Sequence, residues 1–363
     1  MTMRRTIFAI AFFFIAVMST YAQHKFDAAY PDVHDPVMAQ GEDGRYYIFS
    51  TGMGVSVMSS ADMKTWQEEK SVFPFQHVSR EDWERGVRPE ANPKWAADSI
   101  YHFMGHVWAP DIVRHNGLWY LYYSCSSFGK NSSGIGVATN KTLDPTSSDF
   151  LWEDHGPVII SHKHQDNWNA IDPNIAFDAE TGAPYMVYGS FWDGIQLVKL
   201  DASMTKPVTK PVTVARRVER ALKLSEVDDE AAFTIEGNDT IEAGENSIEG
   251  PFIIRHDGWY YLFVSWDYCC RGKNSTYKTV YGRSRNIEGP YLDMAGKPMA
   301  YGGGTLLVGP DKRYYGVGHC SAYDINGQWY FLSHAYDSKY NSAAKIFLRK
   351  MTFRKDGSIK LSK

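Results

Sequence analysis

Five segments of this 363-residue chain repeat one strand–turn–strand pattern, and this repeat restricts the chain to few folds. Each segment has a short apolar strand, a turn that contains a glycine, and an aromatic-rich strand that ends at a serine. The segments are HDPVMAQGEDGRYYIFS from His34, WAPDIVRHNGLWYLYYS from Trp108, IDPNIAFDAETGAPYMVYGS from Ile171, IEGPFIIRHDGWYYLFVS from Ile248, and GHCSAYDINGQWYFLS from Gly318. Since a hairpin cannot bury both of its faces alone, repeated hairpins stack around an axis. The repeat predicts an all-β fold, a five-bladed β-propeller.

Four of the repeats carry an ionisable residue near their start. Counted back from the turn glycine, Asp35 lies nine positions before Gly44, Asp172 ten before Gly182, Glu249 nine before Gly258, and His319 eight before Gly327. We interpret these positions as equivalent, and equivalent positions of a radial array converge on its axis. Because burying like charges together is costly, three carboxylates at one channel mouth indicate a functional site.

These three carboxylates suit the hydrolysis of a glycosidic bond. That reaction needs one carboxylic acid to protonate the leaving oxygen and one carboxylate to activate water or attack the anomeric carbon. Asp35 and Asp172 each precede a proline, which predicts an extended backbone at both. A single Asp-Pro is more often a turn residue, but three acids in repeated positions favour catalysis. Asp111 lies only six positions before its glycine, so we expect a structural, turn-bonding residue there.

His319 has two interpretations from the residues alone. A lone histidine is by default a buried core residue, whereas its place in the fifth repeat directs it to the same axis, where it could bind a cation or polarise a carboxylate. A nucleophilic role for the neighbouring Cys320 or Ser321 is weaker, because the chain has no G-x-S-x-G elbow there.

The N-terminus predicts export. Arg4 and Arg5 precede an apolar run from Ile7 to Met18 and a small-residue site that ends at Ala22, the pattern of a signal peptide. The apolar run is shorter than the roughly 20 residues that cross a bilayer, so we expect no membrane span. We therefore predict a signal peptide at 1–22 and a single catalytic domain at 23–363, periplasmic or extracellular.

Charge and cysteine usage exclude several classes of partner. The chain has 38 basic and 42 acidic residues, so we expect no nucleic-acid or anionic-membrane partner and an uncharged substrate. The four cysteines are too few for a disulfide framework, and none has the C-x2-C spacing of a structural zinc site. The adjacent Cys269 and Cys270 could form a strained vicinal disulfide, stay free, or pair with the other cysteines.

Two irregular segments interrupt the repeats. Gln67 to Met104 is expected to hold outer strands of the first blade and an extended loop. Lys206 to Asn246, basic in its first half and acidic in its second, is expected to be a solvated surface insertion.

With these residues in place, the chain resembles the family-43 glycoside hydrolases, specifically the endo-acting α-1,5-L-arabinanases, over nearly the whole mature sequence. The segments that carry the resemblance are VHDPVMAQ, HVWAPDIVRHNGLWYLYYSCSSFGKNSSGIGVATN, NAIDPNIAFD, YGSFWDGIQLVKLD, IEGPFIIRHDGWYYLFVSWDYCCRGKNSTY, GRSRNIEGPYLD, GGGTLL and GHCSAYD. Gly250 departs from the family, in which alanine is common after the acid, and both irregular segments look long.

The resemblance implies a propeller that cleaves arabinan or arabino-oligosaccharides by inversion. It implies that Asp35 is the general base, Glu249 the general acid, and Asp172 the carboxylate that orients the acid and raises its pKa. His319 would match a histidine near a calcium ion in the channel, held largely through water; no organic cofactor is expected. The resemblance also implies that the sugar groove is lined by His34, Trp108, Phe128, Asn169, Ser190 and Phe191. We expect a monomer.

The sequence leaves three alternatives to an endo-acting hydrolase. An exo-acting α-L-arabinofuranosidase or β-xylosidase uses the same chemistry, and the long irregular segments could close one end of the groove. An inactive carbohydrate-binding propeller would not need all three acids. A protein-interaction propeller would not need convergent acids either.

Overall fold

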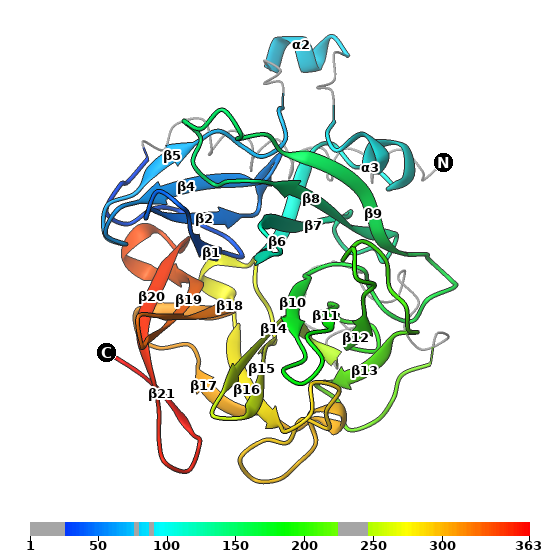
Figure 1. Ribbon diagram of the computed structural model, residues 1–363, viewed down its shortest axis with the longest axis vertical. Helices are drawn as coiled ribbons and strands as arrows, with labels where there is room; N and C mark the ends of the chain where they lie inside the picture. Colours follow the sequence, from blue (N-terminus) through cyan, green and yellow to red (C-terminus); the bar gives the residue numbers. More distant parts are fainter. Residues whose placement is uncertain (1–25, 76–79, 87–90, 224–245) are drawn as a thin grey trace, which may run out of the picture.

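The structure is a computed structural model that describes residues 26–75, 80–86, 91–223 and 246–363. Its strands form five antiparallel sheets arranged around a central axis, which confirms the predicted five-bladed β-propeller (Figure 1). The predicted signal peptide, 1–22, lies outside the described residues, so the division at residue 22 stays a prediction. Within the described part of the chain, no helix has the length and apolar character needed to cross a bilayer.

Each blade has four strands that run in chain order from the axis outward. The first blade has β1 Val37–Gln40, β2 Tyr46–Ser50, β4 Ser56–Ser60 and β5 Gln67–Glu69. The second has β6 His106–His115, β7 Leu118–Cys125, β8 Ser133–Asn140 and β9 Glu153–Ser161, with β3 Gly52–Met53 added beside β6. The third has β10 Asn174–Phe177, β11 Pro184–Tyr188, β12 Ile195–Lys199 and β13 Val212–Ala215.

The last two blades complete the ring. The fourth has β14 Ile248–His256, β15 Trp259–Trp266, β16 Lys278–Ser284 and β17 Thr305–Val308. The fifth has β18 Tyr314–Ile325, β19 Gln328–Asp337, β20 Ala343–Phe353 and β21 Ile359–Leu361. The predicted hairpins are the two innermost strands of each blade, and they surround the axis in Figure 1.

Aromatic side chains fill the space between blades, many of them from the aromatic-rich second strand of each hairpin. Tyr122 and Tyr123 of β7 and Phe263 of β15 are all fully buried. Tyr123 packs edge-on against Phe73 from the first blade, with ring centroids 4.9 Å apart. Because large side chains on a pleated surface bury much apolar area, these contacts hold neighbouring blades together.

The ring closes where the N-terminal segment meets the last blade. Asp32 forms an isolated antiparallel bridge with Lys345 of β20, and the Lys345 ammonium lies 2.8 Å from the Asp32 carboxylate. Nearby, the backbone N–H of Val33 donates to the carbonyl of Ala344 at 3.0 Å. These bonds fix the residues just before the first repeat, so they also fix the start of the segment that bears Asp35.

Asp111 is structural, but it does not bond a turn as the sequence analysis expected. It is buried in β6, where its Oδ2 accepts from the Ile175 N–H at 2.8 Å and the Asn174 side-chain amide at 3.2 Å. Asn174 in turn accepts from the Ile253 N–H at 2.8 Å. These side chains therefore join the innermost strands of successive blades, because those strands present N–H groups that their own sheets leave unpaired.

The two irregular segments differ from expectation. Between Gln67 and Met104, the described residues form one strand, β5, and two short helices, α2 Arg80–Glu84 and α3 Lys94–Ser99. The second segment includes β13, and its Arg216 is buried rather than solvated, since its guanidinium makes a two-pronged ion pair with Asp193. Residues 224–245 lie outside the described residues.

Candidate functional site

Around the axis, each blade contributes one residue in the left-handed backbone conformation where its first strand begins or bulges. These residues are Asp35 (φ 52°), Ala109 (φ 37°), Asp172 (φ 58°), Gly250 (φ 57°) and His319 (φ 50°). In blades two, four and five the residue falls inside a shift of the strand register, a β-bulge, which redirects side chains. The expected extended backbone before Pro36 and Pro173 is therefore wrong, because the bonds of the ring impose a left-handed turn there.

A polar group holds the backbone N–H of each of these five residues. The N–H of Ala109 donates to Thr51 Oγ1 (2.8 Å), that of Asp172 to Ser124 Oγ (2.9 Å), that of Gly250 to Asp172 Oδ2 (3.2 Å), that of His319 to Ser265 Oγ (2.7 Å), and that of Asp35 to His334 Nδ1 (3.1 Å). Each acceptor belongs to the preceding blade, so the five bonds form a closed ring that stabilises the left-handed conformations.

Glu249 does not occupy the same repeat position as the other three predicted residues. Gly250 takes the left-handed place in the fourth blade, and Glu249 stands one residue earlier, where the other bulged blades have Trp108 and Gly318. The count from the turn glycine aligned Glu249 wrongly with the other three residues, because loop lengths differ between blades. A shift of one residue along a strand changes which side chain faces the channel. The structure nevertheless brings Glu249 beside Asp172, through the bond from the next residue, Gly250.

Asp35 is a buried carboxylate surrounded by three histidines. Its Oδ2 accepts from the Thr51 hydroxyl at 2.6 Å and lies 2.8 Å from His34 Nδ1. Its Oδ1 lies 3.2 Å from His319 Nδ1 and 3.5 Å from His334 Nδ1. Burial alone would raise the pKa of Asp35, but these imidazoles, His34 first, outweigh burial and hold the pKa well below its usual range. Asp35 is therefore ionised at neutral pH.

Glu249 is held in the opposite state. Its Oε2 accepts from the Ser190 hydroxyl at 2.7 Å and its Oε1 from the Tyr277 hydroxyl at 2.8 Å. Burial, followed by the negative charge of the Cys270 thiolate, raises its pKa to about 7 in spite of those two bonds. A substantial fraction of Glu249 therefore carries a proton at neutral pH.

The pKa of Asp172 is shifted in the same direction as that of Glu249 and opposite to that of Asp35. Burial raises its pKa well above the usual range, and the charges of Glu249 and then Asp35 act in the same direction. The interaction between two buried acids is mutual, so ionising either Asp172 or Glu249 makes the other harder to ionise. Asp172 also fixes the backbone next to Glu249, because its Oδ2 accepts from the Gly250 N–H.

The residues predicted to line a sugar groove have different environments. His34 and Ser190 contact Asp35 and Glu249 directly. Phe191 is buried with its ring 6.0 Å from that of Tyr268, whereas Phe128 is 61% exposed. Trp108 is half-buried and donates to His106 Nδ1 at 2.8 Å. Asn169 is buried, and its Oδ1 has no hydrogen-bond partner.

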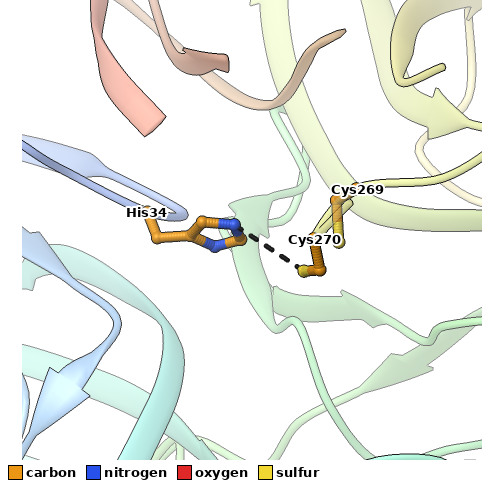
Figure 2. Close-up of side chains that lie close together, drawn as sticks. All are labelled: His34, Cys269 and Cys270. Atoms are coloured by element: carbon orange, nitrogen blue, oxygen red, sulfur yellow. Dashed lines mark hydrogen bonds between the residues drawn. The ribbon is translucent and has the colours of Figure 1, made fainter. Parts of the chain in front are cut away.

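All four cysteines are free thiols, which resolves the alternatives that the sequence left open. Cys269 and Cys270 lie beside His34, and Cys270 Sγ is 3.8 Å from His34 Nε2 (Figure 2). A hydrogen bond from the Cys269 thiol lowers the pKa of the Cys270 thiol to about 5, and His34 acts in the same direction against the effect of burial. The pair thus places a thiolate next to the three carboxylates.

The surroundings of His319 fit a calcium ion only if water supplies most of its ligands. Calcium takes six to eight oxygen ligands. His319 Nδ1 faces Asp35, and the other neighbours of that carboxylate are largely imidazoles. In the described ranges, the triads of possible metal ligands are His34–Cys269–Cys270 and His34–Asp35–His334, and neither includes His319. The calcium site implied by the resemblance stays a prediction.

Gly250 fits closely against His319. A Cβ atom at position 250 would lie 2.9 Å from His319 Nδ1, closer than a carbon and a nitrogen can pack. An alanine, common in the family, would therefore require the imidazole to shift from its place beside Asp35. The glycine sets the position of this histidine.

Sequence reasoning missed several residues that shape the site. Tyr277, just before β16, ends one of the segments that carry the resemblance but was given no role, and His334 in β19 lies outside those segments. The serines at strand ends did carry a signal, since Ser124 and Ser265 bond the next blade. In the first blade this role falls to Thr51, one residue beyond the predicted serine.

Comparison with known proteins agrees with the fold and shows the family. Residues 30–359 match the family described as "Glycosyl hydrolases family 43". An extracellular exo-α-(1→5)-L-arabinofuranosidase of Cellvibrio japonicus is 43% identical over 317 residues, 87% of this chain and 82% of that protein. An extracellular endo-α-(1→5)-L-arabinanase of Bacillus subtilis is 36% identical over 325 residues, 88% and 85% of the two chains.

A solved structure gives the same result. The crystal structure of an exo-1,5-α-L-arabinanase from a bovine ruminal metagenomic library has a TM-score of 0.81 and 50% identity, and the match covers 94% of this chain and all of that one. The ring of left-handed residues, the buried carboxylates and these matches lead to one conclusion: the chain belongs to family 43 of the glycosyl hydrolases.

Proposed function

We propose that this enzyme hydrolyses the α-1,5-L-arabinofuranosyl linkages of arabinan by inversion. The observation that carries the proposal is the opposite electrostatic setting of two buried carboxyl groups in one site. The pKa of Asp35 is held well below its usual range, while that of Glu249 is raised to about 7. Two carboxyl groups whose surroundings push their pKa values apart can act as a base and an acid at the same pH.

In the proposed mechanism, ionised Asp35 removes a proton from a water molecule as the water oxygen attacks the anomeric carbon. The carbon–oxygen bond to the leaving sugar breaks on the opposite face, and protonated Glu249 transfers its proton to that leaving oxygen. Asp35 ends protonated and Glu249 ionised, so the site is reset when one proton passes back through solvent. One water is consumed for each linkage cleaved.

Asp172 supports the acid without touching the reacting atoms. Its bond to the Gly250 N–H fixes the backbone that bears Glu249. When Asp172 is ionised, its charge also favours the protonated form of Glu249, because the interaction between the two acids is mutual. We therefore assign Asp172 as a positioning residue that keeps the proton on Glu249.

The predicted groove residues supply contacts to the sugar. His34, half-buried and bonded to Asp35, would position the ring whose linkage is cleaved. Trp108, Phe128 and Phe191 would offer aromatic faces to furanose rings, and Ser190 and Asn169 would offer polar groups. A calcium ion near His319, when bound, would add positive charge beside Asp35.

The mode of attack has two candidates. The resemblance in sequence predicts endo cleavage, which remains our prediction from the motifs. One specific observation favours an exo mode. The ruminal metagenome enzyme and the Cellvibrio enzyme, at 50% and 43% identity, are both named as exo enzymes, whereas the Bacillus subtilis endo enzyme is 36% identical.

A time course on linear α-1,5-arabinan tests the activity and its mode together. Purified wild type and Asp35→Ala are incubated with debranched arabinan, and products are resolved by chromatography. A ladder of intermediate oligosaccharides from wild type alone supports the endo mode, and one short product from the first minutes supports the exo mode. Absence of any hydrolysis by wild type would overturn the proposal.

We also propose that the enzyme is exported, in line with its predicted signal peptide. Two relatives carry the word extracellular in their names. Expression of the full chain in a bacterial host, followed by mass spectrometry of the N-terminus, should find a mature protein that begins near Gln23. Retention of residues 1–22 would contradict export by cleavage.

A further inference from the structure

We propose that Cys269, Cys270 and His34 form a binding site for a soft divalent metal ion such as Zn²⁺ at the mouth of the active site. The three residues come from distant parts of the chain, His34 just before the first blade and the cysteines just after β15. One ligand atom from each, two sulfurs and an imidazole nitrogen, lie within 4.8 Å of one another. Figure 2 shows the two sulfurs and the imidazole edge gathered in one place.

The distances suit tetrahedral coordination. With Zn–S bonds of about 2.3 Å and Zn–N bonds of about 2.0 Å, a sulfur and a nitrogen bound to one tetrahedral ion lie roughly 3.6 Å apart. Cys270 Sγ and His34 Nε2 are already 3.8 Å apart. The ion would therefore fit between them with little movement of the backbone.

The surroundings hold His34 in the orientation that a metal ligand needs. Its Nδ1 lies 2.8 Å from the Asp35 carboxylate, which leaves Nε2 directed toward Cys270. A carboxylate that accepts from one imidazole nitrogen while the other binds an ion is the usual support of a zinc-bound histidine. Asp35, His34 and the proposed ion have this arrangement.

Tyr336 fixes the loop that carries the thiols. Its hydroxyl accepts from the Cys270 N–H at 2.7 Å and lies 2.7 Å from His34 Nε2. One oxygen therefore holds Cys270 and His34 together. When an ion binds, Nε2 exchanges this hydroxyl for the metal, and any proton on Nε2 or on either sulfur passes to solvent.

Cys270 is exposed, so an ion can enter from solvent and keep a water as its fourth ligand. Three protein ligands and one open position distinguish such a site from a closed structural zinc site. The hard cations Mg²⁺ and Ca²⁺ prefer oxygen ligands, and the two sulfurs would exclude them.

An ion at this site would inhibit the hydrolase, a consequence that rests on the proposed function. Its positive charge would lie on Nε2 of His34, whose Nδ1 is 2.8 Å from the carboxylate of Asp35, the proposed base. A cation there would attract the negative charge with which Asp35 takes a proton from water. The bound ion would also draw His34 away from the sugar.

Metal binding is tested on the purified full chain, independently of activity. Free thiols are first counted with a thiol reagent after mild reduction and removal of the reductant. The protein is then equilibrated with micromolar ZnCl₂, freed of excess ion by gel filtration, and analysed for zinc. We expect one ion per chain in wild type and in Cys320→Ala, which removes a buried thiol elsewhere, and at least tenfold weaker binding in Cys269→Ser and Cys270→Ser.

Cobalt gives a second readout of the ligands. Co²⁺ in the wild-type site should show thiolate-to-metal charge-transfer absorption and the strong visible bands of a tetrahedral ion, and both should vanish in Cys270→Ser. The site would be disproved by absence of zinc from wild type, by equal zinc in the cysteine variants, or by a vicinal disulfide that mild reduction leaves intact. Zinc that binds without slowing arabinan hydrolysis would overturn the inhibitory role only.

Discussion

The hydroxyl of Tyr277 donates a 2.8 Å hydrogen bond to Oε1 of Glu249. This bond stabilises the ionised carboxylate, so it opposes the burial that raises the pKa of Glu249 to about 7. Tyr277 therefore limits how far the pKa of the proposed acid rises. The acid stays able to give up its proton near neutral pH.

Replacing Tyr277 with phenylalanine should move the alkaline limb of the pH–activity profile upward. Activity needs protonated Glu249, so it falls as pH rises through the pKa of that residue. A hydrogen bond to a charged group contributes about 1.5–3 kcal/mol, and about 1.4 kcal/mol corresponds to one pKa unit, so the limb should shift by about one unit or more.

The profile of kcat/KM against pH measures this shift. Tyr291→Phe is the matched control, because the Tyr291 hydroxyl is also buried but bonds the Ile287 carbonyl away from the acids. An alkaline limb that stays in place in Tyr277→Phe would contradict the role assigned to this hydroxyl.

Inversion predicts the anomer that is released first. Attack by water on the face opposite the leaving group turns an α-arabinofuranosyl linkage into a product with a β-anomeric centre. Proton NMR during the first minutes of hydrolysis should show the β-anomer before mutarotation. Initial release of the α-anomer would point to a covalent intermediate and would exclude Asp35 as a simple base.

Asp111 should make the protein less stable as pH rises. Burial raises its folded-state pKa to about 7, above the unfolded value of about 3.9. Its contribution to stability is therefore fully present below about pH 4 and is lost as pH rises through 7, by up to about 4 kcal/mol. Asp111→Asn keeps an oxygen for the Ile175 N–H but cannot ionise.

Urea unfolding of wild type and Asp111→Asn at pH 5 and pH 8 isolates this group, because the other titrating groups cancel in the double difference. Wild type should lose more unfolding free energy than the variant between the two pH values. Parallel losses in both proteins would show that Asp111 does not titrate in this range.

Loss of the buried Arg216 guanidinium should destabilise the third blade strongly. Arg216→Ala leaves the Asp193 carboxylate buried without its charge partner, which typically costs about 3–5 kcal/mol. Lys297→Ala is the control, since it breaks an exposed ion pair with Glu219 that solvent screens and that contributes little to stability. Equal melting temperatures for the two variants would contradict the importance of burial here.

The repeat in the sequence predicts the fold well, because hairpins that cannot bury both faces have few ways to assemble. The same repeat brought Asp35, Asp172 and His319 to equivalent places in the ring. The sequence analysis included Glu249 among the residues of the site but assigned it the wrong position in the repeat. The register of a bulge decides which of two adjacent side chains faces the channel. Loop lengths hide that register from a count of residues.

Other features of the site depend on contacts between distant segments. Tyr277 meets Glu249 through the fold of the fourth blade, and His334 meets Asp35 only where the last blade closes the ring against the first. The proximity of Cys270 to His34 is likewise tertiary, so no spacing along the chain could predict it. Asp111 resembled a turn residue because it lies close to its turn glycine. Its actual bond runs to the next blade, which the sequence does not show.

The central claim is that Asp35 and Glu249 act as base and acid, and it is tested most directly by the hydrolysis rate of linear α-1,5-arabinan. Asp35→Asn and Glu249→Gln should each lower kcat by about 10²–10⁴-fold. Asp111→Asn, a change to an equally buried carboxyl group outside the site, should stay within a few-fold of wild type when circular dichroism shows that all three variants are folded. A folded Asp35→Asn or Glu249→Gln variant that keeps wild-type activity would contradict the account.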